Sequence, residues 1–164
     1  MRVDASAFVL CSAAAVAGFA HAGTVNVSFV DATRFSDTGS KPWEKEAALR
    51  TLSQHLQALG VRYLPPDQVL KIDVLDVDLA GHVRPTRRGD LRILKGMADW
   101  PKISLRYSLE AHGQVVRSGE ESIANLNYLR DLTRYRSSDS LPYEKRMLED
   151  WFVEHFVEKR ARGD

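Results

Sequence analysis

The chain has 164 residues, of which 44% are apolar and 27% charged, which suits one domain with a real hydrophobic core. Its formal net charge of +1 excludes a strong overall field that would draw the protein to nucleic acid. The only cysteine is Cys11, so the chain beyond it has no thiol for a disulfide, a nucleophile or a metal ligand.

The first 22 residues have the features of a cleavable signal peptide. Arg2 supplies a positive charge, the stretch 5–20 carries no charge, and Ala20-His21-Ala22 has the small-x-small pattern that signal peptidase cleaves. A membrane-spanning helix needs about 20 strongly apolar residues, and this stretch is shorter and rich in alanine. We therefore expect a periplasmic or secreted protein, cleaved near Ala22, with one domain over residues 23–164 and no integral membrane segment once processed. The alternative is an uncleaved anchor or a buried helix.

Two elements are predicted in the first part of this domain. Residues 24–30 alternate between apolar and polar, which predicts a half-buried strand. Ser40 and Pro42 indicate the start of a helix, and Gly60 is expected to cap its C-terminal end. Four leucines recur along this helix at the spacing of one apolar stripe: Leu49, Leu52, Leu56 and Leu59.

Three strands are predicted next. In Val69–Ala80 the apolar pattern changes face near Leu75, which indicates either a bulge or two partly covered faces. Residues 82–101 are irregular and basic, with room for a short strand at 91–94. Residues 103–109 alternate clearly, and His112-Gly113 predicts a tight turn into a partner strand over 115–123.

The register of the partner strand places a charged residue on its apolar face, and a second helix is predicted after this strand. Its register places Glu120 on the core face unless Gly119 forms a bulge, and we expect the bulge. The helix is predicted from Pro142 to about Arg160, with Asp139 or Ser140 as its N-cap. Its apolar residues form two adjacent rows: Tyr143, Met147 and Trp151, and Leu148, Phe152 and Phe156.

The order of the predicted elements is β-α-β-β-β-α. Each helix has one apolar stripe, and each clear strand has one apolar face. The pattern therefore predicts an α+β fold, in which both helices pack on one face of a mainly antiparallel four-stranded sheet. The other face of the sheet is left for solvent or for a partner.

Acidic residues gather near the end of the second predicted strand. Asp76 and Asp78 match two places of a calcium-binding EF-hand loop, but Ala80 and Arg87 stand where that loop needs oxygen ligands. In a strand, Asp76 and Asp78 project from one face, where they could chelate a cation or raise each other's pKa, with His82 following closely. The interpretation that we favour is a solvated sheet face, or partners for the arginines downstream.

Basic residues dominate the segment that follows. Such a patch could bind phosphate or an anionic lipid head group, although most charge runs are merely solvated. Nucleic acid is not expected, because export removes it as a partner and no aromatic residues are interleaved for stacking. No nucleophile motif, glycine-rich phosphate loop or metal-ligand spacing is present, so we predict no catalytic residue, metal ligand or cofactor. The candidate binding residues are Asp76, Asp78, His82, Arg84, Arg87 and Arg88.

Four strings of residues can be compared with known families, and the first and last of them are specific: KIDVLDVDLAG at 71–81, DWPKI at 99–103, SGEE at 118–121 and YEKRMLEDWF at 143–152. Together with Trp43-x-x-Glu46, they resemble an exported Gram-negative family known only as domain of unknown function 3016. The resemblance covers nearly the whole chain after the predicted signal peptide. It implies export and a single domain, and it brings no assigned activity or catalytic residues.

We therefore expect a non-enzymatic binding or accessory protein of the cell envelope. Its partner would be an envelope protein or an anionic lipid, held by the exposed sheet face or by the basic segment Arg84–Arg92. The alternative is a metal- or anion-binding protein, or a hydrolase, centred on Asp76 and Asp78 with His82 or Glu120 nearby. A structural protein without a ligand is the third interpretation.

Overall fold

The computed structural model describes residues 23–96, 98–130 and 140–158. The predicted signal peptide, the predicted cap Asp139 and the predicted helix end at Arg160 lie outside these residues. The elements are β1 (Thr24–Phe29), α1 (Pro42–Tyr63), β2 (Gln68–Asp78), β3 (His82–Thr86), β4 (Gly89–Ile93), β5 (Lys102–Ala111), β6 (Gln114–Ala124) and α2 (Pro142–Val153). A 3-10 turn, η1 (Ala32–Arg34), precedes α1, and a π-helical turn, η3 (Glu154–Glu158), continues α2.

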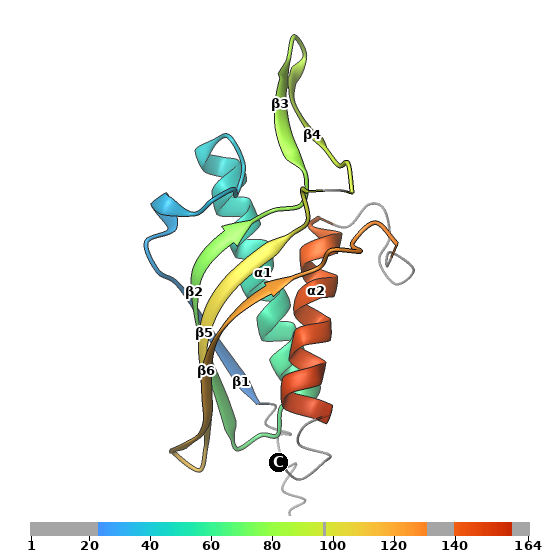
Figure 1. The fold of residues 1–164 in the computed structure, drawn as a ribbon. Helices are drawn as coiled ribbons and strands as arrows, with labels where there is room; N and C mark the ends of the chain where they lie inside the picture. Colours follow the sequence, from blue (N-terminus) through green and yellow to red (C-terminus); the bar gives the residue numbers. More distant parts are fainter. Residues whose placement is uncertain (1–22, 97, 131–139, 159–164) are drawn as a thin grey trace, which may run out of the picture.

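The main sheet has the strand order β1-β2-β5-β6. β1 and β2 are parallel, whereas β2, β5 and β6 pair antiparallel. Both helices lie on one face of this sheet (Figure 1). The predicted α+β fold, with a mainly antiparallel four-stranded sheet and helices on one side, is therefore confirmed.

A second sheet consists of β3 and β4 alone, and it projects from the body as a two-stranded ribbon (Figure 1). We call this ribbon, residues 82–93, the arm. The prediction of an irregular segment was wrong here, apart from the short strand that overlaps β4. Pro85 and Gly89 indicated breaks, but proline is tolerated in an edge strand and Gly89 follows the turn with a φ of 121°.

Helix α1 begins as predicted and ends later. The Glu44 carboxylate accepts hydrogen bonds from the backbone N–H groups of Ser40 and Lys41, which satisfies donors at the start of the helix. The predicted cap at Gly60 was wrong, because α1 continues to Tyr63. A Cβ atom on Gly60 would lie 2.2 Å from Cγ2 of Val25, so this glycine lets α1 approach β1 closely.

The predicted bulge of the second strand is confirmed between Val74 and Asp76. It returns the apolar side chains to the helix-covered face, so that Val74 and Val77 are both buried there. The predicted bulge at Gly119 was wrong. The irregularity in the β5–β6 pair lies opposite Leu109 and Glu110, near the hairpin turn.

Because of this bulge near the turn, the side chains of β6 beyond it point to the opposite face from the one predicted. Glu120 therefore does not face the core. Glu120 pairs with Arg106 on the helix-free face of the sheet, with Nη2–Oε2 2.9 Å. Gly119 instead lies opposite Tyr107, where a Cβ atom would be 3.0 Å from the tyrosine ring. The predicted tight turn at His112-Gly113 is confirmed, and both residues have positive φ.

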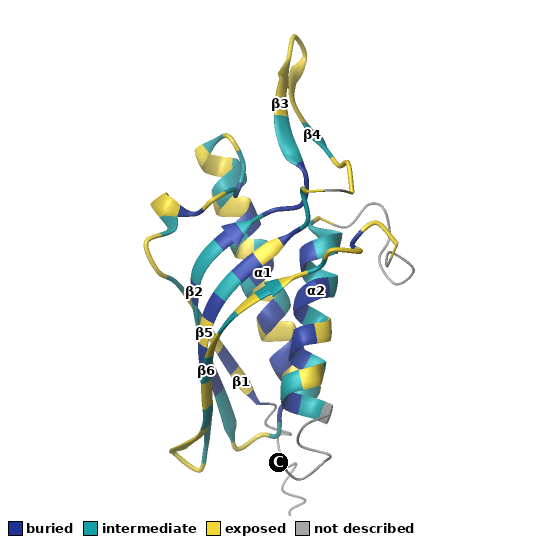
Figure 2. Ribbon diagram, viewed as in Figure 1, coloured by how far each residue is buried: buried dark blue, intermediate teal, exposed yellow. Residues whose placement is uncertain are grey.

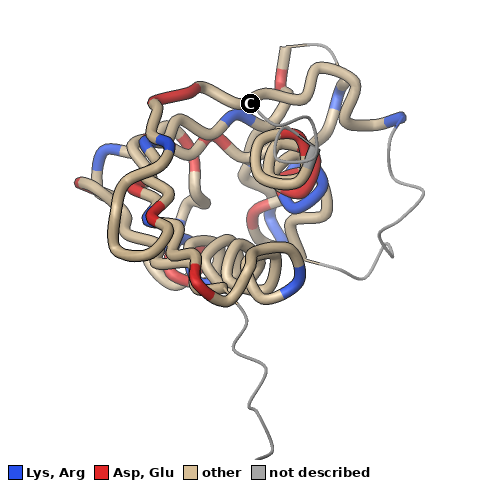
Figure 3. The backbone as a smooth tube through the Cα atoms, turned by 90° about the horizontal axis from the view of Figure 1, so that it is seen from below, with Lys and Arg blue, Asp and Glu red and all other residues tan. Residues whose placement is uncertain are grey.

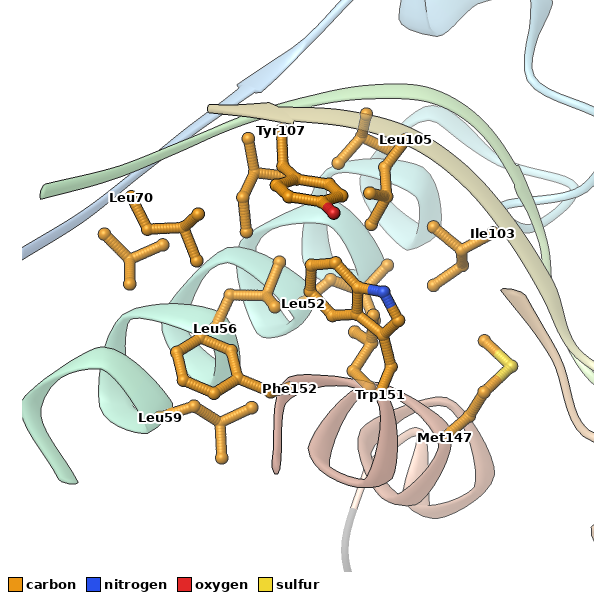
Figure 4. Packing of buried hydrophobic residues seen from close by; sticks show 14 of the residues in the cluster. Leu52, Leu56, Leu59, Leu70, Ile103, Leu105, Tyr107, Met147, Trp151 and Phe152 are labelled. Carbon is orange, nitrogen blue, oxygen red and sulfur yellow. The ribbon is translucent and has the colours of Figure 1, made fainter. Parts of the chain in front are cut away.

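The core lies between the sheet and the two helices (Figure 4). Leu52 and Leu56 of α1 and Leu148 and Phe152 of α2 are at most 2% exposed. Burying each such side chain contributes roughly 1.5–3 kcal/mol to folding. Both predicted apolar rows of α2 are buried except at Tyr143. The predicted cap Ser140 was wrong, because Leu141 occupies the N-cap position in a left-handed conformation without a capping side chain.

Candidate functional site

The two acidic candidates lie near the end of β2, on its helix-free face. The Asp76 carboxylate accepts hydrogen bonds from the backbone N–H and the hydroxyl of Ser36, both at 2.7 Å. Asp78 forms a β-bridge with Asp37. Burial raises the pKa of Asp78, and the nearby Asp37 and Asp76 carboxylates raise it further. The Asp76 carboxylate and the Asp78 backbone thus anchor the segment that leads from η1 to α1.

The basic candidates lie on the arm, apart from the acids. His82 and Arg84 belong to β3, whereas Arg87 and Arg88 form the turn between β3 and β4. All three arginines are exposed, and Figure 2 shows the outer part of the arm as exposed throughout. The structure therefore does not bring the six candidates into one pocket. A binding role for these residues stays a prediction.

Arg92, on β4, holds the base of the arm against the body. Its guanidinium forms a two-point ion pair with Asp37, with Nη1–Oδ2 2.9 Å and Nη2–Oδ1 3.1 Å. Nη1 also donates to the carbonyl oxygen of Ala80 at 3.1 Å. Charge-assisted pairs of this two-point kind are strong and restrict orientation. The sequence placed Arg92 in a basic segment but held no signal for a partner 55 residues away.

Further contacts attach the arm, and Ala80 just before it, to the start of each helix; one of them involves Asp90, which lies close to the turn of the arm. The Ser40 hydroxyl donates to the Asp90 carboxylate at 2.6 Å, and Nζ of Lys41 lies 3.8 Å from the same carboxylate. Glu144 of α2 is 2% exposed, and its Oε1 accepts the backbone N–H of Ala80 at 2.7 Å. Burial raises the pKa of Glu144 above its usual value. The arm is thus a fixed projection at its base.

A pocket of about 330 Å³ lies between the arm base and the starts of both helices. Its polar and charged lining residues are Thr38, Glu44, Thr51, Asp90, Arg92 and Ser140. The charged members already have partners within the fold: Arg92 binds Asp37, Asp90 accepts from Ser40, and Glu44 accepts from the start of α1. The pocket charges therefore hold the arm against the body, and none of them is presented as a free acid or base.

The arginines that have acidic partners lie on the body and, in the case of Arg92, at the base of the arm. Six arginines of the described residues form ion pairs with acidic side chains: Arg34, Arg50, Arg62, Arg92, Arg106 and Arg146. Arg117 donates to the carbonyl oxygen of His155. Around the body, basic and acidic residues are interspersed, as the view from the end opposite the arm shows (Figure 3).

The remaining four arginines of the described chain gather at one end of the molecule. Arg84, Arg87 and Arg88 lie on the arm, and Arg130 lies in the turn 125–130. That turn packs against the loop 94–99, because the Tyr128 hydroxyl donates to Asp99 and accepts the backbone N–H of Gly96. No ion pair joins any of these four arginines to an acid within the described residues. We call the arm, the described loop residues 94–96 and 98–99, and the turn 125–130 the arm end.

Two classes of site are not found in the described parts of the chain. Ranges 23–96, 98–130 and 140–158 contain no group of three or more His, Cys, Asp or Glu residues placed to hold a metal ion. Among the same residues, no helix has the length and apolar character needed to cross a membrane.

Comparisons with known proteins place the chain in a family. No curated protein matches it. Among solved structures, a PelC dodecamer from Paraburkholderia phytofirmans is similar over 82% of this chain and 89% of that chain, with 14% identity and a TM-score of 0.32. This degree of similarity does not define a shared function. A family model does match residues 23–154, and the chain therefore belongs to the family described as "Protein of unknown function (DUF3016)".

Proposed function

We propose that this protein is an exported, non-enzymatic accessory protein of the cell envelope that binds an anionic partner through its arm. The observation that carries the proposal is the concentration of arginines without an acidic partner on one projecting ribbon. Arg84, Arg87 and Arg88 are exposed there, whereas the arginines of the body are mostly paired. Arginine at such a surface suits phosphate and carboxylate groups, because its guanidinium presents several donors in a rigid fork.

The fixed base of the arm supports this proposal. Binding costs less free energy when the binding groups are already held in position. The Arg92–Asp37 ion pair and the Glu144–Ala80 hydrogen bond join the arm base to two separate parts of the body. The arginines at the tip are therefore presented away from the surface of the sheet, where a large partner can approach them.

Export supports the choice of an envelope partner. The proposal takes residues 1–22 as a signal peptide, since they combine Arg2, an uncharged stretch and a small-x-small end. A hydrolase centred on Asp76 and Asp78 is not favoured, because both oxygens of the Asp76 carboxylate already accept hydrogen bonds from Ser36. Glu120 does not join them either, since β5 separates it from β2.

The test measures how strongly the protein binds immobilised heparin, a general polyanion, as salt is raised. We expect Arg84→Ser/Arg87→Ser/Arg88→Ser to elute at clearly lower salt than the wild type, since exposed charge contacts are screened by salt. The matched control is Arg34→Ser/Arg50→Ser/Arg106→Ser, which removes the same charge from side chains that are 83%, 59% and 58% exposed. If both triple variants elute together, binding follows net charge alone and the proposal fails.

A further inference from the structure

Exposed leucines accompany the arginines at the arm end. Their exposed fractions are 56% for Leu91, 37% for Leu94, 62% for Leu126 and 42% for Leu129. Large apolar side chains gathered on an exposed surface often mark an interaction site. Three of them, Leu91, Leu126 and Leu129, lie on the two segments that carry the unpaired arginines, and Leu94 precedes Lys95.

On the arm, one of these leucines and one of the arginines are direct neighbours. Leu91 lies directly opposite Arg84 in the β3–β4 ladder, so both side chains are on one face of the arm. Val83 and Arg92 pair on the other face, which lines the pocket at the arm base. The Arg84–Leu91 face is therefore turned away from that pocket.

The base of the arm adds a second part to this surface. Leu129 lies against the loop 94–99, since a Cβ atom on Gly96 would be 2.5 Å from Cδ1 of Leu129. Lys95 and Arg130 are exposed beside it. The two acids of this end are engaged: Asp90 accepts from Ser40, and Asp99 accepts the backbone N–H of Lys95.

We infer that the anionic partner of the arm is a lipid surface, on which the arginines contact head groups while the leucines enter the interface between head groups and acyl chains. This inference rests on the proposed function and names its partner. Stable attachment to a membrane surface commonly combines buried apolar area with electrostatic attraction to anionic lipids. A soluble polyanion would use the arginines and leave the leucines exposed, which is why the leucines favour lipid.

The experiment measures co-sedimentation of the protein with vesicles. One set contains phosphatidylglycerol mixed with phosphatidylcholine, and the other contains phosphatidylcholine alone. Every variant is expressed from the full chain, so that all carry the same N-terminus. We expect binding to the anionic vesicles only, and a roughly 100-fold weaker partition for Arg84→Ser/Arg87→Ser/Arg88→Ser, from about fivefold for each of the three basic residues.

A leucine variant separates lipid from other anions. Leu91→Ser/Leu126→Ser is expected to lose at least about tenfold in vesicle binding while keeping its elution from heparin. Leu94 and Leu129 stay in place because their side chains lie against Gly81 and Gly96. The matched control is Val61→Ser/Val115→Ser, which alters apolar residues that are 64% and 60% exposed elsewhere on the fold. Circular dichroism establishes that each variant is folded.

The outcomes distinguish the inference from the proposed function. If the wild type binds heparin through its arm but does not bind anionic vesicles, the lipid inference is wrong and the proposed function stands with another anionic partner. Equal loss of vesicle binding in the leucine variant and in the valine control also overturns the lipid inference. A protein that binds neither heparin nor anionic vesicles overturns both.

Discussion

Arg92 and Asp37 join the arm to the segment before α1 through an ion pair that is made at two points, at 2.9 and 3.1 Å. Their side chains are 27% and 24% exposed, so solvent screens this pair less than an ion pair on the open surface. The two residues are 55 positions apart in the sequence. This pair helps to set the orientation of the arm, and with it the position of the arginines that we propose to bind an anionic partner.

Removing the Arg92 side chain is expected to destabilise the fold and loosen the arm. For Arg92→Ala we predict a loss of about 2–3 kcal/mol, because Asp37 and the Ala80 carbonyl lose a charged donor. Urea denaturation measures this loss, and hydrogen exchange should show faster exchange over residues 82–93. The control Arg106→Ala breaks an exposed ion pair and should cost under about 1 kcal/mol. Equal losses in the two variants contradict the role given to Arg92.

A substitution at Gly60 tests whether α1 and β1 are packed as closely as the structure shows. Alanine is ordinarily the better helix residue by about 1 kcal/mol, but here its Cβ atom would lie 2.2 Å from Cγ2 of Val25. We therefore expect Gly60→Ala to destabilise the protein by about 1–3 kcal/mol in thermal or urea unfolding. Gly60→Ala/Val25→Ala should be more stable than the sum of the two single losses predicts. Stabilisation by Gly60→Ala alone would falsify this packing argument.

Glu144 gives a pH dependence with a definite sign. Burial raises its pKa in the folded protein, so the folded state holds the Glu144 proton to higher pH than the unfolded chain does. The destabilising contribution of this group is therefore absent at low pH, grows as pH rises from the unfolded-state pKa towards the raised folded-state pKa, and is constant above it. Glu144→Gln keeps an oxygen that can accept the Ala80 N–H. Its stability relative to the wild type should increase from about pH 4 to about pH 8 in urea titrations; a constant difference contradicts the prediction.

The β5–β6 turn contains a residue that is not optimal for its backbone. His112 has a φ of 51° and Gly113 a φ of 77°, and asparagine suits the first of these positions better than histidine. His112→Asn is expected to stabilise the protein by up to about 1 kcal/mol. The control His112→Ala removes the same exposed contact with Asp67 without favouring positive φ, and it should give no gain. Thermal unfolding of the two variants compares them directly.

The elements that could be predicted from the sequence are those with regular apolar spacing. The leucine stripe of α1, the alternation in β5 and the two apolar rows of α2 all depend on neighbours in the chain, so local pattern sufficed for them. The bulge in β2 was also visible, because the apolar phase changes near Leu75.

The features that could not be predicted depend on contacts between distant residues. A glycine that ends a helix cannot be told apart in sequence from a glycine that lets a helix approach a strand closely. At Gly60, the contact with Val25 of β1 shows that the second role applies. Gly119 posed the same problem, since its role is to leave space for Tyr107. The candidate arginines were visible as a basic run, but the ribbon that presents them depends on the pairing of β3 with β4 and on the Arg92–Asp37 contact.

The most direct test of the account asks which residues respond to an anionic ligand. A short heparin fragment is titrated into the ¹⁵N-labelled protein, and the backbone amide shifts are followed residue by residue. The account predicts that the largest shifts fall on residues 82–93, led by Arg84, Arg87 and Arg88. Largest shifts on the helix-free face of the main sheet, around Arg106 and Glu120, would contradict the claim that the arm is the binding element.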